Sequence, residues 1–253
     1  MVFKYLAIAL SVTLQAAPLA HADTTLVAVA ANFAGAAEAI SAAFHGETGH
    51  IAQITTGSTG KLYAQITEGA PFEVLLAADA KTPEKLVAEG QAVAASRFTY
   101  AIGGLTLWSV EAGLIGADAK TSLTSDKIRF LAIANPDLAP YGVAAKEALT
   151  NLGLWDEVQP KIVLGQNIGQ VFAMATAGAA DAAFVATSAL AGPDAPTTGS
   201  RLNVPQDLFT PIRQDAVLLY KGKDNAAAVA FLAFLKGEKA HDIIKSFGYD
   251  LAE

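Results

Sequence analysis

Small hydroxyl and glycine residues stand directly before a helical pattern in residues 55–66, which read TTGSTGKLYAQI. Residues 51–55 favour a β-strand and apolar residues then recur at helical spacing, so a helix is predicted to begin at Ser58 or Thr59. The start of a helix presents N–H groups without intrahelical partners at the positive end of the helix dipole. Together with a hydroxyl group, these donors can bind an anion without any charged side chain. Simple capping explains the pattern as well, because Ser and Thr cap helices without a ligand.

The same kind of corner recurs where other predicted helices follow predicted strands. The four corners are Asn32, which is predicted as an N-cap, and the pairs Ser58-Thr59, Tyr141-Gly142 and Ile168-Gly169. In open α/β sheets the carboxyl ends of the strands line the ligand crevice. Two pairs of corners facing each other across a cleft would form a cage of neutral donors. Such a cage suits a small dianion, because each hydrogen bond to a charged group contributes about 1.5–3 kcal/mol.

Catalytic and metal-binding patterns find no support in the sequence. The segment GSTGK departs from the phosphate-binding loop G-x-x-x-x-G-K-[ST], which requires Gly in place of Thr55 and Ser or Thr in place of Leu62. It also departs from the nucleophile elbow G-x-S-x-G. The histidines after residue 22 lack the i, i+4 spacing of a helical metal pair, and the carboxylates are scattered. We therefore expect no enzyme, no cofactor and no direct coordination of a metal.

The beginning of the chain is typical of an exported bacterial protein. Lys4 precedes an apolar run at residues 5–14, and the tail Ala20-His21-Ala22 fits a cleavage site, so residues 1–22 are predicted to be a signal peptide. No later apolar run has the length of a membrane span, and the expected location is the periplasm. The 253 residues contain no cysteine, which excludes disulfides and thiolate chemistry. A net charge of −7 makes nucleic acid a poor partner.

Strands and helices alternate in a first set of elements, which predicts an α/β fold with mainly parallel sheets. Strands are predicted at residues 26–30, 51–55 and 73–77, and the third helix of this set is predicted to begin at Pro83. The β-rich stretch 97–110 has no helix inside it and is interrupted by two glycines. We interpret this stretch as a crossing between two lobes.

A second set of elements follows the crossing. Strands are predicted at residues 128–132, 161–164 and 182–186, and a helix is predicted over residues 143–152. Residues 191–211 are rich in Pro, Gly and Thr and are expected to form an exposed connection. The return crossing is predicted as a strand at residues 215–220, and the helical tail after it packs on the first lobe.

Four segments of the chain resemble the periplasmic molybdate-binding proteins of ABC importers: AVAANFAGAAEAI, TTGSTGKLYAQITEGAP, the run from ANPDLAPYG to LGLWD, and KGEKAHDIIKSFGY. The resemblance extends over nearly the whole chain after the signal, and SRFTYAIG with NPDLAPYG is similar to a variant branch of that family. It implies a two-lobed class II periplasmic binding protein fold, each lobe a mainly parallel sheet flanked by helices. Lobe 1 would comprise residues 23–102 and 217–253, and lobe 2 residues 103–216.

The resemblance also implies the residues that bind the oxyanion through hydrogen bonds, without direct contact to the metal atom. These residues are Asn32 and Ala31 from AANF, Ser58 and Thr59 from GSTG, Tyr141 from APYG, and Ile168, through its backbone, from QNIGQ. Many relatives have a Tyr at the position of Ala186, so Tyr141 is the candidate to supply a phenol from another corner. The variant branch carries Thr at position 31, where Ala31 offers only its backbone.

The predicted function is therefore that of an extracytoplasmic binding protein for a tetrahedral oxyanion, molybdate or tungstate. It is expected to act as a monomer and to deliver its ligand to an ABC importer permease at the inner membrane. Phosphate is disfavoured because at neutral pH it keeps a proton that needs an acceptor, and no carboxylate lies at the four corners. Two alternatives stay open. One is a binder of sulfate or an organic acid, although a carboxylate ligand normally calls for Arg; the other is a secreted enzyme.

Overall fold

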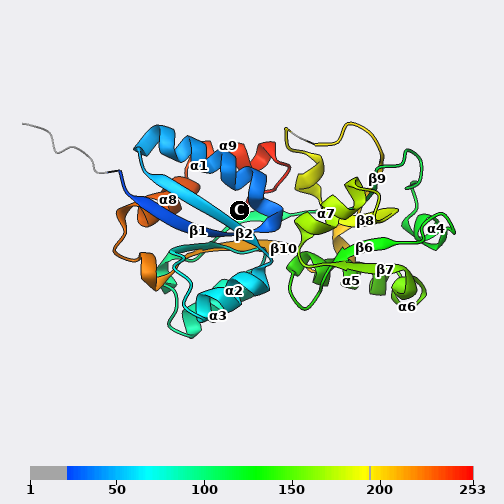
Figure 1. Cartoon of the computed structure of the whole chain (residues 1–253), viewed down its shortest axis with the longest axis horizontal. Helices are drawn as coiled ribbons and strands as arrows, with labels where there is room; N and C mark the ends of the chain where they lie inside the picture. Colours follow the sequence, from blue (N-terminus) through cyan, green and yellow to red (C-terminus); the bar gives the residue numbers. More distant parts are fainter. Residues whose placement is uncertain (1–21, 194, 253) are drawn as a thin grey trace, which may run out of the picture.

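Two lobes lie side by side in the computed structural model, which describes residues 22–193 and 195–252 (Figure 1). The predicted signal peptide, residues 1–22, falls outside the described residues except for Ala22. Each lobe is built on a five-stranded sheet. Within the described part of the chain, no helix is both long enough and apolar enough to cross a membrane.

The sheet of the first lobe is mixed and has the strand order β2-β1-β3-β10-β4. β2, β1 and β3 are parallel neighbours, whereas β10 runs antiparallel to both β3 and β4. The strands are β1 (Thr24–Ala30), β2 (Ile51–Gly57), β3 (Val74–Leu76), β4 (Phe98–Gly103) and β10 (Ile212–Leu218). The antiparallel part is therefore made by the strands next to the crossings between the lobes.

The second sheet repeats this arrangement with the order β7-β6-β8-β5-β9. β7, β6 and β8 are parallel, and β5 is antiparallel to both β8 and β9. The strands are β5 (Leu105–Ser109), β6 (Leu131–Ala134), β7 (Ile162–Gly165), β8 (Ala182–Ala186) and β9 (Ser200–Asn203). The chain passes from β4 of one sheet to β5 of the other through Gly104 alone, as the two glycines in this stretch suggested.

Helices cover both faces of the first sheet, with α1 and α9 above it and α2 and α3 below it in Figure 1. Alternating side chains of β1 serve the two faces: Val27 and Val29 pack with α1, α8 and α9, while Ala28 packs with α2 and α3. The α-helices are α1 (Ala34–Thr48), α2 (Thr59–Thr67), α3 (Lys81–Ala88), α4 (Ala119–Thr124), α5 (Pro140–Asn151), α6 (Trp155–Val158), α7 (Ile168–Thr176), α8 (Ala226–Leu235) and α9 (Glu238–Ser246). The 3-10 helices are η1 (Ala31–Phe33), η2 (Ala94–Ser96), η3 (Gln159–Lys161), η4 (Thr187–Leu190), η5 (Gln206–Leu208) and η6 (Tyr220–Gly222).

The register of the parallel strands brings the predicted corners together in pairs. Ala30, the last residue of β1, pairs with Gly57, the last residue of β2, so η1 and α2 begin beside each other. In the second lobe Ala134 of β6 pairs with Gly165 of β7, and the chain then leads to α5 and α7. Helices that follow neighbouring parallel strands start at the same edge of the sheet.

The return from the second lobe differs from the prediction. β10 begins at Ile212, which pairs with Gly103 of β4, so the whole strand belongs to the first sheet and the predicted boundary at 216/217 is too late. Pro211 and Arg213 interrupt the apolar pattern there, so the start of the strand could not be predicted from it. The expected exposed connection at residues 191–211 also contains an edge strand, β9, which pairs with β5.

Two elements of the second lobe start at other residues than predicted. The strand predicted at residues 128–132 is β6, which begins at Leu131, because the backbone N–H groups of Arg129 and Phe130 donate to the Asp181 carboxylate instead. The helix predicted at residues 143–152 is α5, which begins three residues earlier at Pro140. Proline is favoured at the first position of a helix, since its fixed φ suits the helix and its missing N–H costs nothing there. Tyr141 therefore belongs to the first helical turn.

Candidate functional site

A small cavity of about 10 Å³ lies where the helix starts of the two lobes meet. A cavity of this size holds about one water-sized sphere. All six residues predicted as anion ligands line it: Ala31, Asn32, Ser58, Thr59, Tyr141 and Ile168. The structure thus places the predicted residues from four separate segments around one point, while their binding of an anion stays a prediction.

The first corner is built differently from the N-cap predicted for Asn32. Asn32 is the second residue of η1, and neither η1 nor α1 has a side-chain cap. The Asn32 amide nitrogen donates instead to Oε1 of Gln214 at 2.7 Å and to the Tyr249 hydroxyl at 3.1 Å. What this corner can offer an anion is therefore its backbone N–H groups, because the first N–H groups of a helix have no intrahelical partner.

The second corner supplies two buried hydroxyl groups. Ser58 is the N-cap of α2, and its Oγ accepts a long hydrogen bond of 3.4 Å from the backbone nitrogen of Lys61. Thr59 is the first residue of α2, and its Oγ1 accepts from the backbone nitrogen of Ala78 at 3.0 Å. A hydroxyl that accepts from a backbone N–H keeps its own hydrogen to donate elsewhere. Capping and anion binding are thus compatible at this corner.

The third corner is the start of α5, on the second lobe. Pro140 occupies the first helical position and has no N–H, so the backbone N–H of Tyr141 is the first donor of this helix. The next N–H, that of Gly142, already donates to the carbonyl oxygen of Ala139 at 2.9 Å. Gly142 is required here, because a Cβ at this position would lie 2.2 Å from the carbonyl oxygen of Ala134.

The phenol of Tyr141 reaches the crossing between the lobes. A Cβ at Gly103 would lie only 2.2 Å from the Tyr141 hydroxyl, so the hydroxyl packs directly on the backbone of Gly103. Gly103 is not among the residues that line the small cavity. The hydroxyl is buried without a hydrogen-bond partner among the described residues, and burial raises the pKa of this phenol well above its usual value. It is therefore neutral at physiological pH.

The fourth corner is the start of α7. Asn167 is its N-cap, and its Oδ1 accepts from the backbone nitrogen of Gln170 at 2.9 Å. This cap leaves the N–H of Ile168, at the first helical position, facing the helix start without an intrahelical partner. Ile168 is buried and Asn167 lines the cavity with it. Ala186 is the position at which the family resemblance implies a Tyr in many relatives. It lines a neighbouring cavity and is not among the residues around the small one.

The cavity has a neutral wall, and direct contacts hold the lobes closed around it. Among the described residues that line it there is no Asp, Glu, Lys, Arg or His. The backbone nitrogen of Gly60 in α2 donates to the carbonyl oxygen of Leu138 in the other lobe at 2.9 Å. Nearby, the Lys61 ammonium donates to Oε1 of Gln166 across the same boundary. A desolvated wall of oriented neutral donors favours a dianion over a cation or a neutral ligand.

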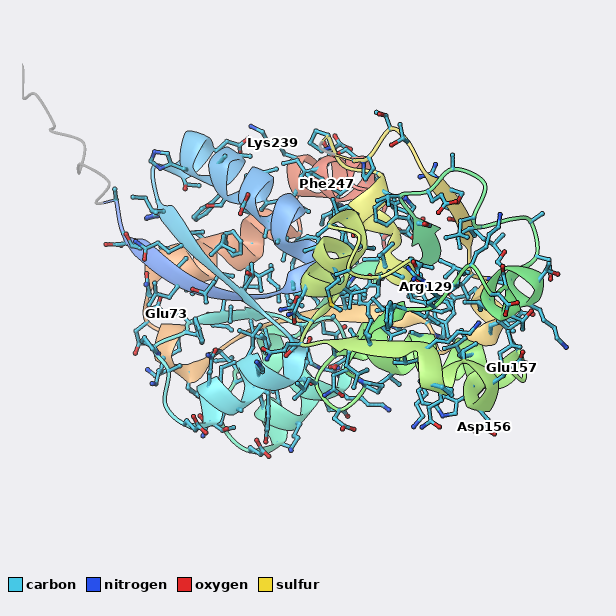
Figure 2. The ribbon with its side chains drawn as sticks, turned by 45° about the vertical axis from the view of Figure 1, so that its right-hand side comes forward. Glu73, Arg129, Asp156, Glu157, Lys239 and Phe247 are labelled. Atoms are coloured by element: carbon cyan, nitrogen blue, oxygen red, sulfur yellow. The ribbon has the colours of Figure 1, made fainter. Side chains whose placement is uncertain are left out.

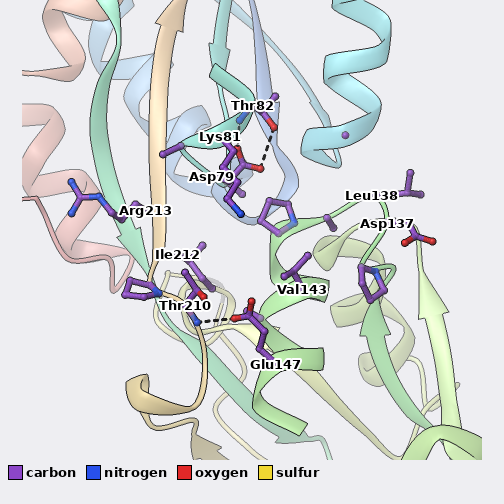
Figure 3. A pocket seen from close by; sticks show the side chains of 18 residues that line it. Asp79, Lys81, Thr82, Asp137, Leu138, Val143, Glu147, Thr210, Ile212 and Arg213 are labelled. Atoms are coloured by element: carbon purple, nitrogen blue, oxygen red, sulfur yellow. Dashed lines mark hydrogen bonds between the residues drawn. The ribbon is translucent and has the colours of Figure 1, made fainter. Parts of the chain in front are cut away.

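Two larger cavities flank the small one along the lobe boundary. The first, of about 400 Å³, is shown in Figure 3; its charged lining residues are Asp79, Asp137, Glu147, Lys81 and Arg213. Oδ1 of Asp79 accepts from the backbone nitrogen of Thr82 at 2.7 Å, and burial raises the pKa of the Asp79 carboxyl group. Three carboxylates and two cations therefore line this larger space, which lacks the wholly neutral wall of the small cavity. The second, of about 230 Å³, is lined mainly by Ala, Gly, Pro and Phe residues.

The sequence interpretation missed the residues that cap the corners or form hydrogen bonds to them. Asn167 stands directly before the predicted Ile168-Gly169 corner and was not identified as its cap, although Asn before a helix is a common cap signal. Gln214 and Tyr249, which bind Asn32, are 182 and 217 residues away from it in the chain. No local spacing pattern indicates such contacts, because they depend on β10 and the C-terminal segment packing beside β1.

The chain is similar to known proteins over nearly its whole length. The family model described as bacterial extracellular solute-binding protein matches residues 25–250. The molybdate-binding protein ModA of Azotobacter vinelandii is 49% identical over 232 residues, which is 92% of each chain. ModA of Rhodobacter capsulatus is 45% identical over 96% of this chain and 94% of its own. The solved structure of the Azotobacter vinelandii periplasmic molybdate-binding protein has a TM-score of 0.86 at 42% identity and covers 90% of this chain.

More distant structures share the fold alone. The sulfate-binding protein SubI from Mycobacterium tuberculosis has a TM-score of 0.73 at 17% identity and covers 92% of this chain. Proteins of this fold carry different ligands, so the fold by itself does not identify the anion. The residues around the small cavity must do so.

Proposed function

The chain belongs to the bacterial extracellular solute-binding proteins, and from this membership we propose that it captures molybdate between its two lobes for an ABC importer. Its relatives at 45–49% identity are molybdate-binding proteins that match more than nine-tenths of the chain. The observation that carries the proposal is the neutral cavity at the meeting point of four helix starts. A fully deprotonated tetrahedral dianion is bound by hydrogen-bond donors, and helix-start N–H groups and hydroxyl groups of the lining residues can supply them.

The proposed ligand set follows from the geometry of each corner. Ser58 and Thr59 donate through their hydroxyl groups. Each hydroxyl oxygen already accepts a hydrogen bond from a backbone N–H, so its own hydrogen is available for the anion. Tyr141 and Ile168 donate through their backbone N–H groups at the starts of α5 and α7. Ala31 and Asn32 donate through the backbone of η1. Tungstate has the same charge and shape and is proposed as a second ligand of this set.

The proposed mechanism is closure of the lobes over the anion. Ser58 and Thr59 belong to one lobe and Tyr141 and Ile168 to the other, so an anion touching all four favours the closed arrangement by its differential affinity. The small size of the cavity favours a compact ion over an organic acid with a carbon chain. The protein is proposed to act as a monomeric periplasmic carrier without catalytic activity, and an ABC permease at the inner membrane would receive the ligand. Residues 1–22 would direct its export.

Calorimetric titration of the purified protein, without its signal peptide, tests this proposal. The panel contains molybdate, tungstate, sulfate, phosphate and citrate at equal ionic strength. We expect saturable one-to-one binding of molybdate and tungstate, with phosphate and citrate producing no heat of binding. Saturable binding of sulfate alone would replace the proposed ligand, and no heat with any oxyanion would refute the function.

A further inference from the structure

A cluster of buried polar side chains lies directly behind the Asn32 corner. It consists of Gln214 from β10, Tyr249 from the C-terminal segment, and Ser188 from η4 of the second lobe. Gln214 is fully buried, Tyr249 is 3% exposed and Ser188 is 7% exposed. Neither Gln214 nor Tyr249 lines the small cavity, so any role they have there must act through Asn32.

The Tyr249 hydroxyl makes two hydrogen bonds to the same residue. It donates to the backbone carbonyl oxygen of Asn32 at 2.6 Å and accepts from the Asn32 side-chain nitrogen at 3.1 Å. The ring packs edge-on against Phe33, with centroids 5.2 Å apart. One buried phenol therefore fixes both the backbone and the side chain of a residue in the three-residue helix that carries the first corner. Burial raises the pKa of Tyr249, so the phenol stays a neutral donor.

The segment that carries Tyr249 is anchored beside the lobe crossing. It follows α9 through Gly248, whose φ of 76° ends the helix, and Asp250 then pairs with Ile102, just before Gly103, by backbone bonds of 2.7 and 3.1 Å. Phe247 lies at the end of α9, beside the neighbouring lobe (Figure 2). A Cβ on Gly192 of that lobe would lie 2.9 Å from the Phe247 ring, so the two lobes are in close contact here.

The second lobe reaches the same carbonyl group. Oγ of Ser188 donates to the carbonyl oxygen of Asn32 at 3.3 Å. This oxygen therefore accepts from Tyr249 in its own lobe and from Ser188 in the opposite lobe. The Tyr249 bond exists within one lobe and does not need closure, whereas the Ser188 bond joins the two lobes and forms only when they meet.

We propose that Tyr249 is a positioning residue for the anion site, because its hydroxyl holds the Asn32 corner in the orientation that Ser188 then joins on closure. The inference rests on the proposed function, since it assigns the support of the same site. Without the hydroxyl, the Asn32 carbonyl loses its donor from the same lobe and the Asn32 amide keeps only Gln214, so the N–H groups of η1 are held less firmly. Preorganised donors lose affinity when their support is removed, even if the donors themselves stay in place.

The test is Tyr249→Phe, which keeps the ring against Phe33 and removes the hydroxyl. We expect the molybdate dissociation constant to rise about tenfold, mainly through faster dissociation. This is the size of effect expected when the site loses one supporting hydrogen-bonding group. Tyr220→Phe, at a half-exposed phenol of the same lobe, is the matched control and should bind as the wild type. A merely structural role would lower the thermal midpoint of the free protein and leave the dissociation rate of molybdate at 25 °C unchanged.

Two further readouts keep the outcome decisive. If Tyr249→Phe does not fold, Ser188→Ala takes its place, with an expected loss of about threefold in affinity; wild-type binding would overturn the inference. If the wild type itself binds no molybdate, the proposed function fails separately. The positioning is then read in the ligand-free protein from the amide resonance of Phe33, whose peptide contains the Asn32 carbonyl. This resonance must shift in Tyr249→Phe and stay in Tyr220→Phe, and an unchanged Phe33 resonance contradicts the proposal.

Discussion

At the residue scale, the candidate site depends on hydroxyl groups that accept a hydrogen bond within the protein and can donate another to an anion. Ser58 and Thr59 accept hydrogen bonds from backbone N–H groups and keep their own hydrogens for a ligand. Tyr141 is different, because its hydroxyl packs on Gly103 and has no hydrogen-bond partner among the described residues. The family resemblance suggested this phenol as an anion donor, but the geometry points to the backbone N–H of Tyr141.

Replacing Tyr141 with Phe separates these two interpretations. Tyr141→Phe keeps the backbone N–H and removes a buried hydroxyl without a partner, so molybdate affinity should stay within about threefold of the wild type. The free energy of unfolding should be unchanged or slightly higher, because the removed hydroxyl makes no hydrogen bond and its burial costs free energy. Calorimetry and denaturant unfolding measure both quantities. A loss of tenfold or more in affinity would show that the phenol itself binds the anion.

Ala31 is the position at which a donor can be added. It lines the small cavity and also the neighbouring cavity of about 230 Å³, so a larger side chain has space on one side. Ala31→Thr adds a neutral hydroxyl beside the anion, and we expect tighter molybdate binding by about 1 kcal/mol, or roughly fivefold. Ala31→Val, of nearly the same shape without the hydroxyl, is the control for filling the space. Equal or weaker binding by the Thr variant relative to the Val variant would contradict the prediction.

At the scale of elements, the sequence predicts which four corners come together better than it predicts the element boundaries. The four corners are visible because small and hydroxyl residues at helix starts have strong local preferences, as at Ser58. The start of β10 at Ile212 and the whole of β9 were missed, since these strands are specified by pairing with β4 and β5. The contacts behind Asn32 were also missed, because they join residues far apart in the chain.

The cap of α7 allows charge and helix geometry to be tested separately. Asn167→Asp keeps an acceptor for the Gln170 N–H and should preserve the stability of the protein, since Asp and Asn cap helices equally well. It also places a negative charge at the edge of the cavity, and like charges repel. We expect molybdate affinity to fall at least tenfold, a loss of about 1.4 kcal/mol or more.

Asn167→Ala is the companion variant of this experiment. It removes the cap without adding charge and should lower the free energy of unfolding by about 1 kcal/mol, with a smaller effect on affinity than Asn167→Asp. Binding and unfolding are measured on both proteins under the same salt concentration. If the two variants bind equally weakly, the cap matters and the charge does not, and the anionic nature of the ligand at this corner is in question.

At the scale of the whole molecule, the lobes are closed by contacts that an anion must reinforce. The Gly60 to Leu138 backbone hydrogen bond and the Lys61 to Gln166 contact both cross the boundary beside the cavity. The cavity holds only about one water-sized sphere, so a larger ion requires these contacts to open first. Ligand-free protein in solution is therefore expected to sample an open arrangement, in which the two pairs of helix starts separate.

Small-angle scattering measures this closure directly. We expect the radius of gyration to decrease when molybdate saturates the protein, and the scattering curve of the bound form to fit the closed lobes of Figure 1. Acetate at the same ionic strength should leave the curve of the free protein unchanged. An identical radius of gyration with and without molybdate would show that binding does not close the lobes.

Neutral hydroxyl and N–H donors alone are proposed to hold a molybdate dianion between the lobes. The most direct test of this binding mode is a calorimetric titration of molybdate into the wild type and into the double variant Ser58→Ala, Thr59→Val. Both proteins are first verified as folded. We predict one site per chain in the wild type and an affinity at least about a hundredfold lower in the double variant, because two charge-assisted hydrogen bonds are lost. Wild-type affinity in the double variant would contradict the account, since the anion would then be bound somewhere else.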